Sequence, residues 1–277
     1  MLYCCRKINI STIKENDMSK TVVITGGASG IGKDVADKLS EAGNTIIILD
    51  RSADVNKQNQ YKVDVTDEAG MKKVFEDIAT KHKQIDILLN SAGFGLLGAV
   101  ELVDATDVRN QFDVNVLGTV NAYKFALPLM PSGSKVINLA SAAALNPLPY
   151  RGFYSASKAA VNTISMSARL ECKGFGVEVV SVCPGDAKTN FNANRVRIVK
   201  TNERYGDSIQ NVADHLDKKN DSRMPVSKIT NRLIKIMNKK KNKPLIIIGK
   251  KEKFFHFLCR FLPTSAQLWI LNKLYNK

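Results

Sequence analysis

A short stretch near the N-terminus, where an apolar run breaks into clustered glycines, constrains the fold more than any other feature. Residues 22–25 have the composition of a buried strand, Gly26, Gly30 and Gly32 follow, and residues 33–42 have a helical pattern. A strand that turns tightly into a helix leaves backbone N–H groups at the positive end of the helix dipole, where they bind phosphate groups. The stretch therefore predicts an anion-binding turn, although a glycine-rich connection without chemistry would have the same composition.

The rest of the chain alternates short apolar runs with amphipathic stretches. The apolar runs are rich in β-branched residues and too short for buried helices, which predicts strands at 45–49, 61–65, 85–90, 135–140, 177–182 and 245–248. Helical spacing of apolar residues predicts helices at about 67–82, 105–130, 153–173 and 225–237. Such alternation predicts right-handed βαβ units, and hence an α/β fold of three layers with a doubly wound parallel sheet in the middle.

The chain divides into one domain and two flanking segments. A length of 277 residues with 44% hydrophobic content allows one large globular domain, which we place at residues 18–250. Because Met18 stands just before the first predicted strand, we expect residues 1–17 to be a disordered extension. The polar stretch at 187–224 is expected to be irregular and to form a mobile lid over the carboxyl ends of the strands. Residues 251–277 form a basic, aromatic C-terminal segment.

Positive charge is concentrated in the last third of the chain. The formal net charge is +15, and residues 191–277 carry 20 basic and 6 acidic side chains. Such a region could bind anionic membrane, nucleic acid or an acidic substrate, or it could be a solvated lysine-rich surface. We expect no nucleic-acid partner, because the lysines at 239–241 lack an accompanying recognition motif.

Aromatic and basic residues are interspersed over residues 250–277. The aromatic residues include Phe254, Phe257 and Trp269, and the basic residues include Lys253 and Lys273. This composition is typical of an amphipathic helix that lies in a membrane interface. The same apolar residues could instead cover a substrate pocket or pack on a sister subunit of a homodimer or homotetramer. The sequence leaves these alternatives open.

The cysteine content and the hydropathy of the sequence favour a cytoplasmic location. The five cysteines include no Cys-x-x-Cys pair and only three histidines accompany them, so we expect neither disulfides nor a metal site. No stretch reaches the roughly 18 apolar residues of a membrane-spanning helix, and residues 1–20 lack the apolar centre of a signal peptide. We therefore expect a cytoplasmic protein whose candidate membrane contact is residues 250–277.

Tyr154 and Lys158 are the first candidates for chemistry. They stand four residues apart on a predicted helix, so their side chains project from one face. A phenol has a pKa of about 10, and a neighbouring ammonium favours the phenolate and lowers that pKa. Such a tyrosine could exchange a proton with an alcohol or a carbonyl, although the pair by itself also occurs by chance on helix surfaces.

The motifs around this pair make it specific. In chain order they are Thr25-Gly26-Gly27-Ala28-Ser29-Gly30-Ile31-Gly32, Asn90-Ser91-Ala92-Gly93, Asn115, Ser141, Tyr154-Ser155-Ala156-Ser157-Lys158 and Pro184-Gly185. With this set the chain resembles the short-chain dehydrogenase/reductase family over about residues 20–250. The resemblance implies a single-domain Rossmann-type fold and an NAD(P)-dependent oxidoreductase that acts on a secondary alcohol or on a ketone or aldehyde.

The resemblance also implies the roles of individual residues. Tyr154 would be the general acid/base, and Lys158 would lower the pKa of Tyr154 and hold the nicotinamide ribose. Ser141 would hydrogen-bond the reacting oxygen, and Asn115 would hold a water that relays protons from Lys158. Besides Tyr154 and Lys158, the implied cofactor contacts are Gly26, Ser29, Gly30, Ile31, Gly32, Asp64, Val65, Asn90, Ala92, Gly93, Ala187 and Thr189. Asp64 would bind the adenine amine. Ser91 and Ala187 depart from the usual family residues.

Two neighbouring residues bear on the choice of cofactor. A carboxylate at Asp50, where the second predicted strand ends, could accept both adenosine ribose hydroxyls and would repel a 2′-phosphate. Arg51 argues for NADP(H), because a guanidinium is well shaped for that phosphate. No basic residue stands inside the glycine turn, so NAD(H) is the favoured cofactor and NADP(H) the alternative.

The predicted pocket walls favour a lipophilic substrate. They come from residues 94–100, 142–153 and 187–224 and are largely apolar near Tyr154, where Leu145, Leu148 and Phe153 stand. A lipophilic alcohol or ketone, and with it a place in lipid metabolism, is therefore expected. The alternatives are a non-catalytic dinucleotide-binding protein and a peripheral membrane-binding protein on the same scaffold.

Overall fold

The computed structural model describes residues 19–189, 191, 195–200, 202–218 and 223–275. Residues 1–17, for which the sequence predicts a disordered extension, lie outside the described residues.

The centre of the molecule is a sheet of seven parallel strands in the order β11-β7-β6-β4-β1-β2-β3. The strands are β1 (Thr21–Thr25), β2 (Thr45–Asp50), β3 (Gln60–Lys62), β4 (Ile87–Asn90), β6 (Lys135–Leu139), β7 (Glu178–Pro184) and β11 (Leu245–Ile248). The direction of winding reverses between β1 and β4, and ligands of such sheets bind beyond the carboxyl ends of the strands at this point. The predicted doubly wound α/β fold is confirmed.

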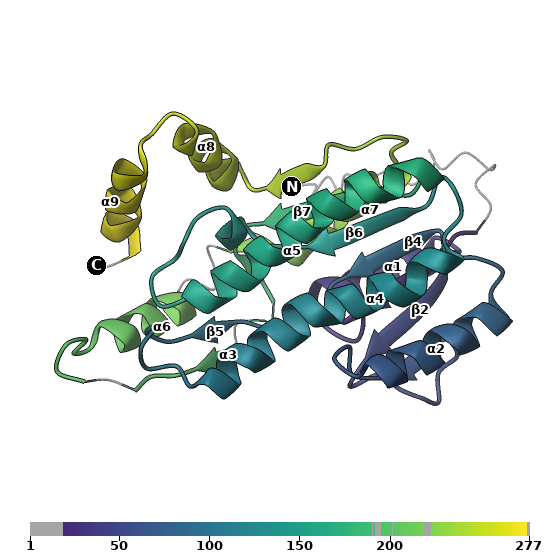
Figure 1. Cartoon of the computed structure of the whole chain (residues 1–277), viewed down its shortest axis with the longest axis horizontal. Coiled ribbons are helices and arrows are strands. Elements are labelled where there is room, and N and C mark those ends of the chain that lie inside the picture. The colour runs from purple at the N-terminus through teal and green to yellow at the C-terminus, as the bar shows by residue number, and fades with distance from the viewer. Residues whose placement is uncertain (1–18, 190, 192–194, 201, 219–222, 276–277) are drawn as a thin grey trace, which may run out of the picture.

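Helices cover both faces of the sheet because both faces are apolar. Val22 and Ile24 of β1 pack towards α1 (Gly30–Glu41) and α7 (Val226–Asn238). Val23, between them, packs towards α2 (Glu68–Lys81), α4 (Gly118–Ala126) and α5 (Gly152–Glu171). Figure 1 shows α4 and α5 lying across one face of the sheet. The alternation follows from the two-residue period of a strand, and it buries β1 almost completely.

The helix predicted at about 105–130 is present, and its hydrogen-bonding pattern changes along its length. It consists of α3 (Ala105–Phe112), the π-helical turn η1 (Asp113–Leu117), α4, and the 3₁₀ turn η2 (Leu127–Leu129). The π turn contains Asn115, which is fully buried and hydrogen-bonded to Phe94 and Ser157 on other elements. Single π turns inside helices are often found at functional sites.

The described residues within 187–224 form more regular structure than the sequence predicts. They include the short strands β8 (Ala187–Lys188), β9 (Val196–Arg197) and β10 (Met224–Pro225) and the helix α6 (Ser208–Lys218). The apolar face of α6, which includes Ile209 and Leu216, packs on Leu97 of β5 (Leu96–Leu97). The expectation of an irregular stretch was wrong, because burial of this face stabilises a helix within it.

The C-terminal segment forms two helices, α8 (Lys250–Cys259) and α9 (Thr264–Tyr275), separated near Pro263. They form an arm at one end of the molecule, drawn in yellow in Figure 1. Large apolar side chains on the arm face solvent, among them Phe254, Phe261 and Trp269. In the part of the chain that the structure describes, no helix has the length and apolar content to cross a membrane.

Two short 3₁₀ turns remain. The turn η3 (Ala142–Ala144) follows β6 at the carboxyl ends of the strands, and η4 (Cys172–Phe175) follows α5 and precedes β7, at the opposite edge of the sheet, where the strands begin.

Candidate functional site

A cleft of about 1450 Å³ lies at the carboxyl ends of the strands. Its floor comes from the loops that follow β1, β2, β4, β6 and β7, and its rim comes from the segment 187–224 and from the C-terminal arm. Most of the predicted site residues line this cleft. They are Gly26, Ser29, Gly30, Ile31, Asp50, Arg51, Asp64, Val65, Ala92, Gly93, Ser141, Tyr154, Lys158, Ala187 and Thr189.

The glycine turn has a geometry that side chains would block. Gly26 and Gly30 have φ angles of +68° and +56°, in the left-handed region that glycine adopts without strain. A Cβ on Gly32 would lie 2.2 Å from the Gly26 carbonyl oxygen, so Gly32 allows α1 to start directly against the turn. The N-terminus of α1 therefore opens into the cleft, where its backbone N–H groups fit the pyrophosphate of a dinucleotide.

Hydrogen bonds join the end of β1 to the loop after β4 beside this turn. The Thr25 hydroxyl oxygen accepts hydrogen bonds from the backbone N–H groups of Ser91 (3.2 Å) and Ala92 (3.3 Å). Asn90 is buried below the cleft, does not line it, and donates a hydrogen bond to Asn138 (2.9 Å). Its side chain therefore supports the floor of the cleft from below.

Three charged residues stand at the other end of the glycine turn, beyond β2 and β3. Asp50 accepts hydrogen bonds from the backbone N–H groups of Ala28 (3.1 Å) and Ser52 (2.9 Å), which fixes its carboxylate beside the turn. The Arg51 guanidinium is largely exposed and lies 3.7 Å from the Asp64 carboxylate. Asp50 and Arg51, the two residues that bear on the choice of cofactor, therefore line the same part of the cleft.

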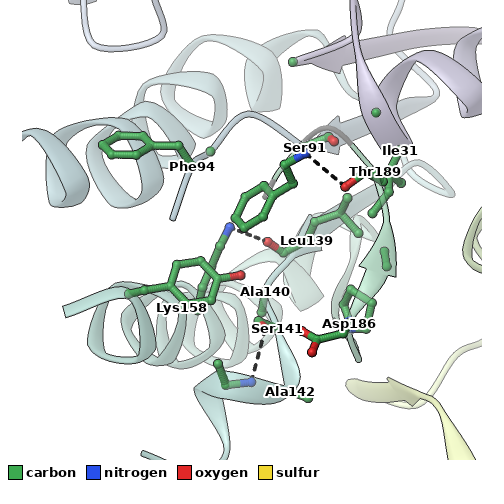
Figure 2. Close-up of a pocket in the computed structure, with 18 of the residues that line it drawn as sticks. Ile31, Ser91, Phe94, Leu139, Ala140, Ser141, Ala142, Lys158, Asp186 and Thr189 are labelled. Atoms are coloured by element: carbon green, nitrogen blue, oxygen red, sulfur yellow. Dashed lines mark hydrogen bonds between the residues drawn. The ribbon is translucent and has the colours of Figure 1, made fainter. Parts of the chain in front are cut away.

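Tyr154, Lys158 and Ser141 converge at the middle of the cleft. Tyr154 and Lys158 come from α5, and Ser141 follows β6 and caps η3 by accepting a hydrogen bond from the Ala143 N–H (3.1 Å). Figure 2 shows the Lys158 ammonium directed towards the Leu139 carbonyl, to which it donates at 2.9 Å, with Ser141 nearby. The arrangement provides a phenol, a hydroxyl and a buried amine at one place.

Gly93 is a close neighbour of this group. A Cβ there would lie 3.2 Å from the Lys158 ammonium nitrogen and 2.7 Å from the Asn115 side-chain oxygen. Glycine thus allows the loop after β4 to approach both side chains.

Asn115 is fully buried and holds the loop that follows Gly93. Its side-chain oxygen accepts from the Phe94 N–H (3.0 Å), and its side-chain NH₂ donates to the Phe94 carbonyl (3.2 Å) and to the Ser157 hydroxyl (3.0 Å). Gln111 also donates to the Phe94 carbonyl, at 2.8 Å. These contacts give the Asn115 side chain a positioning role, while the predicted water relay stays a prediction.

Burial dominates the electrostatics of Tyr154 and Lys158. It lowers the pKa of Lys158 to about 8, so the amine titrates near neutral pH. Burial also raises the pKa of Tyr154, and the hydrogen bond from Ser141 and the positive charge of Arg195 oppose that rise. The lowering of the Tyr154 pKa by Lys158, which the family resemblance implies, stays a prediction.

The substrate end of the cleft is less apolar than predicted. Leu145 and Leu148 line it as expected, whereas Phe153 does not. Arg151, Arg195 and Arg223 also line it, although each is at least nine-tenths buried. Sequence reasoning missed these arginines because an arginine in a polar segment is ordinarily exposed, and no motif marks them.

Among the described residues, no group of three or more histidine, cysteine, aspartate or glutamate side chains is arranged to hold a metal ion.

Comparison with known proteins gives one consistent family. Residues 20–199 match the family model described as short chain dehydrogenase. The chain is 38% identical over 193 residues to a 3-ketodihydrosphingosine reductase of Bacteroides thetaiotaomicron, which covers 68% of this chain and 72% of the relative. It is 30% identical over 256 residues to a probable short-chain type dehydrogenase/reductase, VdlC, of Helicobacter pylori, which covers 88% and 93% respectively.

Solved structures agree with this result. A short-chain dehydrogenase from Streptomyces avermitilis superposes with a TM-score of 0.79 at 22% identity, over 93% of this chain and 97% of that one. The structure of ElxO with NADP bound has a TM-score of 0.68 at 26% identity, over 83% of this chain and 97% of that one.

Proposed function

This chain belongs to the short-chain dehydrogenase/reductase family and is an NAD(P)-dependent oxidoreductase, and we propose that it interconverts a secondary alcohol and a ketone or aldehyde with Tyr154 as general acid/base. The observation that carries the proposal is the convergence of the Tyr154 phenol, the Ser141 hydroxyl and the Lys158 amine in a cleft that also contains the glycine turn. No single one of these features would suffice, since each also occurs in proteins without this chemistry.

The chain's own residues handle the proton and the reacting oxygen. When bound, the nicotinamide cofactor supplies or accepts the hydride. In the direction of reduction, Tyr154 donates its phenolic proton to the carbonyl oxygen, and the Ser141 hydroxyl orients that oxygen. Lys158, when charged, stabilises the phenolate that remains. In the direction of oxidation the phenolate accepts the proton of the alcohol.

NAD(H) is the proposed cofactor, with NADP(H) as the alternative. Support comes from the Asp50 carboxylate, which the backbone N–H groups of Ala28 and Ser52 hold beside the glycine turn, where a 2′-phosphate would meet its charge. Arg51 acts in the opposite sense, but it lies within 3.7 Å of Asp64, which partly neutralises it. The similar ElxO structure has NADP bound, so the alternative has its own support.

The proposed substrate is lipophilic. Leu145, Leu148, Phe191 and Phe255 line the cleft beyond Tyr154 and would contact an alkyl chain. The 38% identical relative is named as a reductase of 3-ketodihydrosphingosine, a lipid. We propose in addition that the segment 187–224, which carries Phe191 and borders the cleft, closes over the substrate as a lid.

Replacement of the phenol tests the mechanism. Tyr154→Phe removes the proton donor and keeps the ring, so turnover should fall by about 100-fold or more while cofactor affinity changes little. Medium-chain ketones and alcohols are screened with both cofactors at the nicotinamide absorbance, and cofactor binding is measured by calorimetry.

Tyr150→Phe is the matched control, because Tyr150 stands four residues earlier, does not line the cleft and contacts Tyr205 instead. Near-full activity of Tyr154→Phe would refute the mechanism. Equal losses of turnover in Tyr154→Phe and Tyr150→Phe would also refute it.

A second proposed property is peripheral membrane contact through the C-terminal arm. Phe254, Phe261 and Trp269 are 68%, 72% and 60% exposed, and the basic residues Lys253, Arg260 and Lys273 stand close to them in the sequence. A basic residue near an anionic surface contributes only about 1 kcal/mol, so insertion of these aromatic side chains would have to supply the rest.

Co-sedimentation with vesicles tests this contact. The full chain is compared with a Phe254→Ser, Phe261→Ser, Trp269→Ser variant on phosphatidylcholine vesicles with and without phosphatidylglycerol, at low and high salt. Substitution is preferable to truncation because Phe255 and Leu271 of the arm line the cleft. Sedimentation that needs both anionic lipid and the three aromatic residues supports the contact. If the full chain does not sediment at low salt, the exposed residues instead suit an interface with a second subunit.

A further inference from the structure

The C-terminal arm contributes a wall of the cleft. Phe255 of α8, together with Leu271 and Leu274 of α9, lines the same cleft as Tyr154. The arm lies beyond residue 199, where the match to the family model ends. The match therefore assigns no role to these residues, and their role has to be worked out from their contacts.

Contacts near both ends of α8 hold this helix against the cleft. In its first turn, the Glu252 carboxylate lies against Gly185, which follows β7, because a Cβ on Gly185 would overlap the carboxylate. At its last residue, the Cys259 thiol donates a hydrogen bond to the side-chain oxygen of Asn146, which follows η3 (3.5 Å). Gly185 and Asn146 both line the cleft. The helix α8 therefore bridges the loops that follow the neighbouring strands β7 and β6.

The helix α8 presents one face to the cleft and another to solvent. Phe255 is half-buried and lines the cleft, whereas Phe254 and Phe257 are 68% and 57% exposed and do not line it. Helical geometry explains the difference, since residues one or two positions apart on a helix point in different directions. A ligand in the cleft would thus contact Phe255 and not its two aromatic neighbours.

Two hydrogen bonds hold the start of α9 against the end of α8. The Gln267 side-chain NH₂ donates to the Cys259 carbonyl (2.8 Å) and to the Leu262 carbonyl (2.8 Å). On the same helix, Leu271 lines the cleft and is 4% exposed, whereas Leu268 is 49% exposed and does not line it. Leu271 therefore belongs to the same wall as Phe255.

This wall continues the apolar lining that begins beside the reaction site. Ser141, Leu145 and Asn146 belong to one short stretch after β6, and all three line the cleft. Asn146, at the end of this stretch, is the residue that α8 contacts. An alkyl chain that starts at Ser141 and Tyr154 and passes Leu145 would reach the arm.

We propose that Phe255 and Leu271 form the distal part of the substrate pocket and select substrates with long alkyl chains. This inference rests on the proposed function and narrows its lipophilic substrate to one whose chain extends from a carbonyl or alcohol at Tyr154 to the arm. Each methylene group that moves from water to this wall should strengthen binding by about fourfold. A short chain would end before the arm and gain nothing from it.

The first test compares methyl ketones that differ only in chain length. 2-Butanone, 2-hexanone, 2-octanone and 2-decanone are assayed with both cofactors, and the chain-length ratio is kcat/KM for 2-decanone divided by kcat/KM for 2-butanone. This ratio should be at least about 100 in the unmodified protein. Phe255→Ala and Leu271→Ala should each lower it by about tenfold or more, because each removes several of the carbon atoms that contact the chain.

Phe257→Ala and Leu268→Ala are the matched controls. Each stands on the same helix as its test residue, is exposed and does not line the cleft, so each should leave the chain-length ratio unchanged. Thermal unfolding shows whether each variant folds, and Phe255→Leu, a milder change at a half-buried position, is the further variant if Phe255→Ala or Leu271→Ala does not. A ratio near one in the unmodified protein would overturn the proposal, as would equal reductions in the test and control variants.

The second test measures binding without turnover. Butanamide and octanamide are titrated by calorimetry into the full chain with saturating cofactor, and octanamide should bind at least about tenfold more tightly. Phe255→Ala should reduce this preference, whereas Phe257→Ala should not, and equal affinities of the two amides for the unmodified protein would overturn the proposal. If no ketone in either screen shows hydride transfer, the proposed alcohol and carbonyl chemistry fails, and the amide titration still decides whether the arm binds an alkyl chain.

Discussion

Adding one methyl group at Gly93 should disable the site while leaving the fold intact. The Cβ of Gly93→Ala would lie 2.7 Å from the Asn115 side-chain oxygen and 3.2 Å from the Lys158 nitrogen. The first distance is too short for any carbon–oxygen contact, so the Asn115 amide or the loop must move. Either movement breaks the pair of hydrogen bonds that joins Asn115 to the Phe94 backbone.

The expected loss of stability follows from these contacts. Each hydrogen bond contributes about 1 kcal/mol, and an overpacked methyl group costs about 1–3 kcal/mol. Partial relaxation makes these contributions overlap, which gives about 2–3 kcal/mol and a fall in melting temperature of about 4–12 °C for a chain of this size. Turnover should fall further, by about 100-fold, because a displacement of about 1 Å at Lys158 disturbs the alignment at Tyr154.

Thermal unfolding and steady-state kinetics on the same preparations measure both effects. Gly174→Ala is the control, since a Cβ there meets no atom within 4 Å. The reasoning is refuted if Gly93→Ala melts within about 1 °C of the unmodified protein and keeps more than half of its kcat.

Two further predictions concern charged residues of the cleft. Asp50→Ala should raise kcat/KM with NADP(H) relative to NAD(H), and Arg51→Ala should lower it, because the two side chains have opposite charges at the same end of the cleft; a strong NADP(H) preference of the unmodified protein would show that Arg51 prevails. Burial lowers the pKa of Lys158 from 10.5 to about 8, so between these pH values the unfolded chain binds more protons than the folded one. The free energy of unfolding of the unmodified protein should therefore rise relative to that of Lys158→Met as the pH increases from 8 to 9.5, and urea unfolding at both pH values measures it. If the difference in free energy between the two proteins stays constant over this range, the burial of the amine is contradicted.

The local sequence pattern was enough to predict every strand of the sheet but not every helical element. Six of the seven strands are short apolar runs whose residues carry that signal whatever surrounds them, and β3 (Gln60–Lys62) overlaps the strand predicted at 61–65, so all seven were predicted from the sequence. The π turn at Asn115 arises from hydrogen bonds to Phe94 and Ser157, which are 21 and 42 residues away, and no local pattern encodes them. The α6 helix has its apolar residues at helical spacing, Ile209 and Val212 among them, but the many polar residues around them concealed the pattern.

In the site, residues that belong to sequence motifs could be predicted, whereas residues whose burial depends on distant elements could not. Residues such as Gly26 and Ser141 belong to contiguous or regularly spaced motifs, and they line the cleft as predicted. Arg195 and Arg223 belong to no motif, and their burial depends on how β9, α6 and β10 fold over the cleft. The sequence carries their charge but not the fact that the charge is buried next to Tyr154.

The buried arginines and the tyrosine should consequently act on one another. The positive charges of Arg195 and Arg151 oppose the rise that burial causes in the pKa of Tyr154, while the negative charge of Asp186 adds to that rise. Arg195→Met removes one of the positive charges, so it should raise the pKa of Tyr154 and keep the phenol protonated to higher pH, which is the form that donates a proton in reduction. The alkaline limb of kcat for reduction should therefore lie at higher pH in Arg195→Met than in the unmodified protein. A limb that stays in place or moves to lower pH would contradict this reasoning.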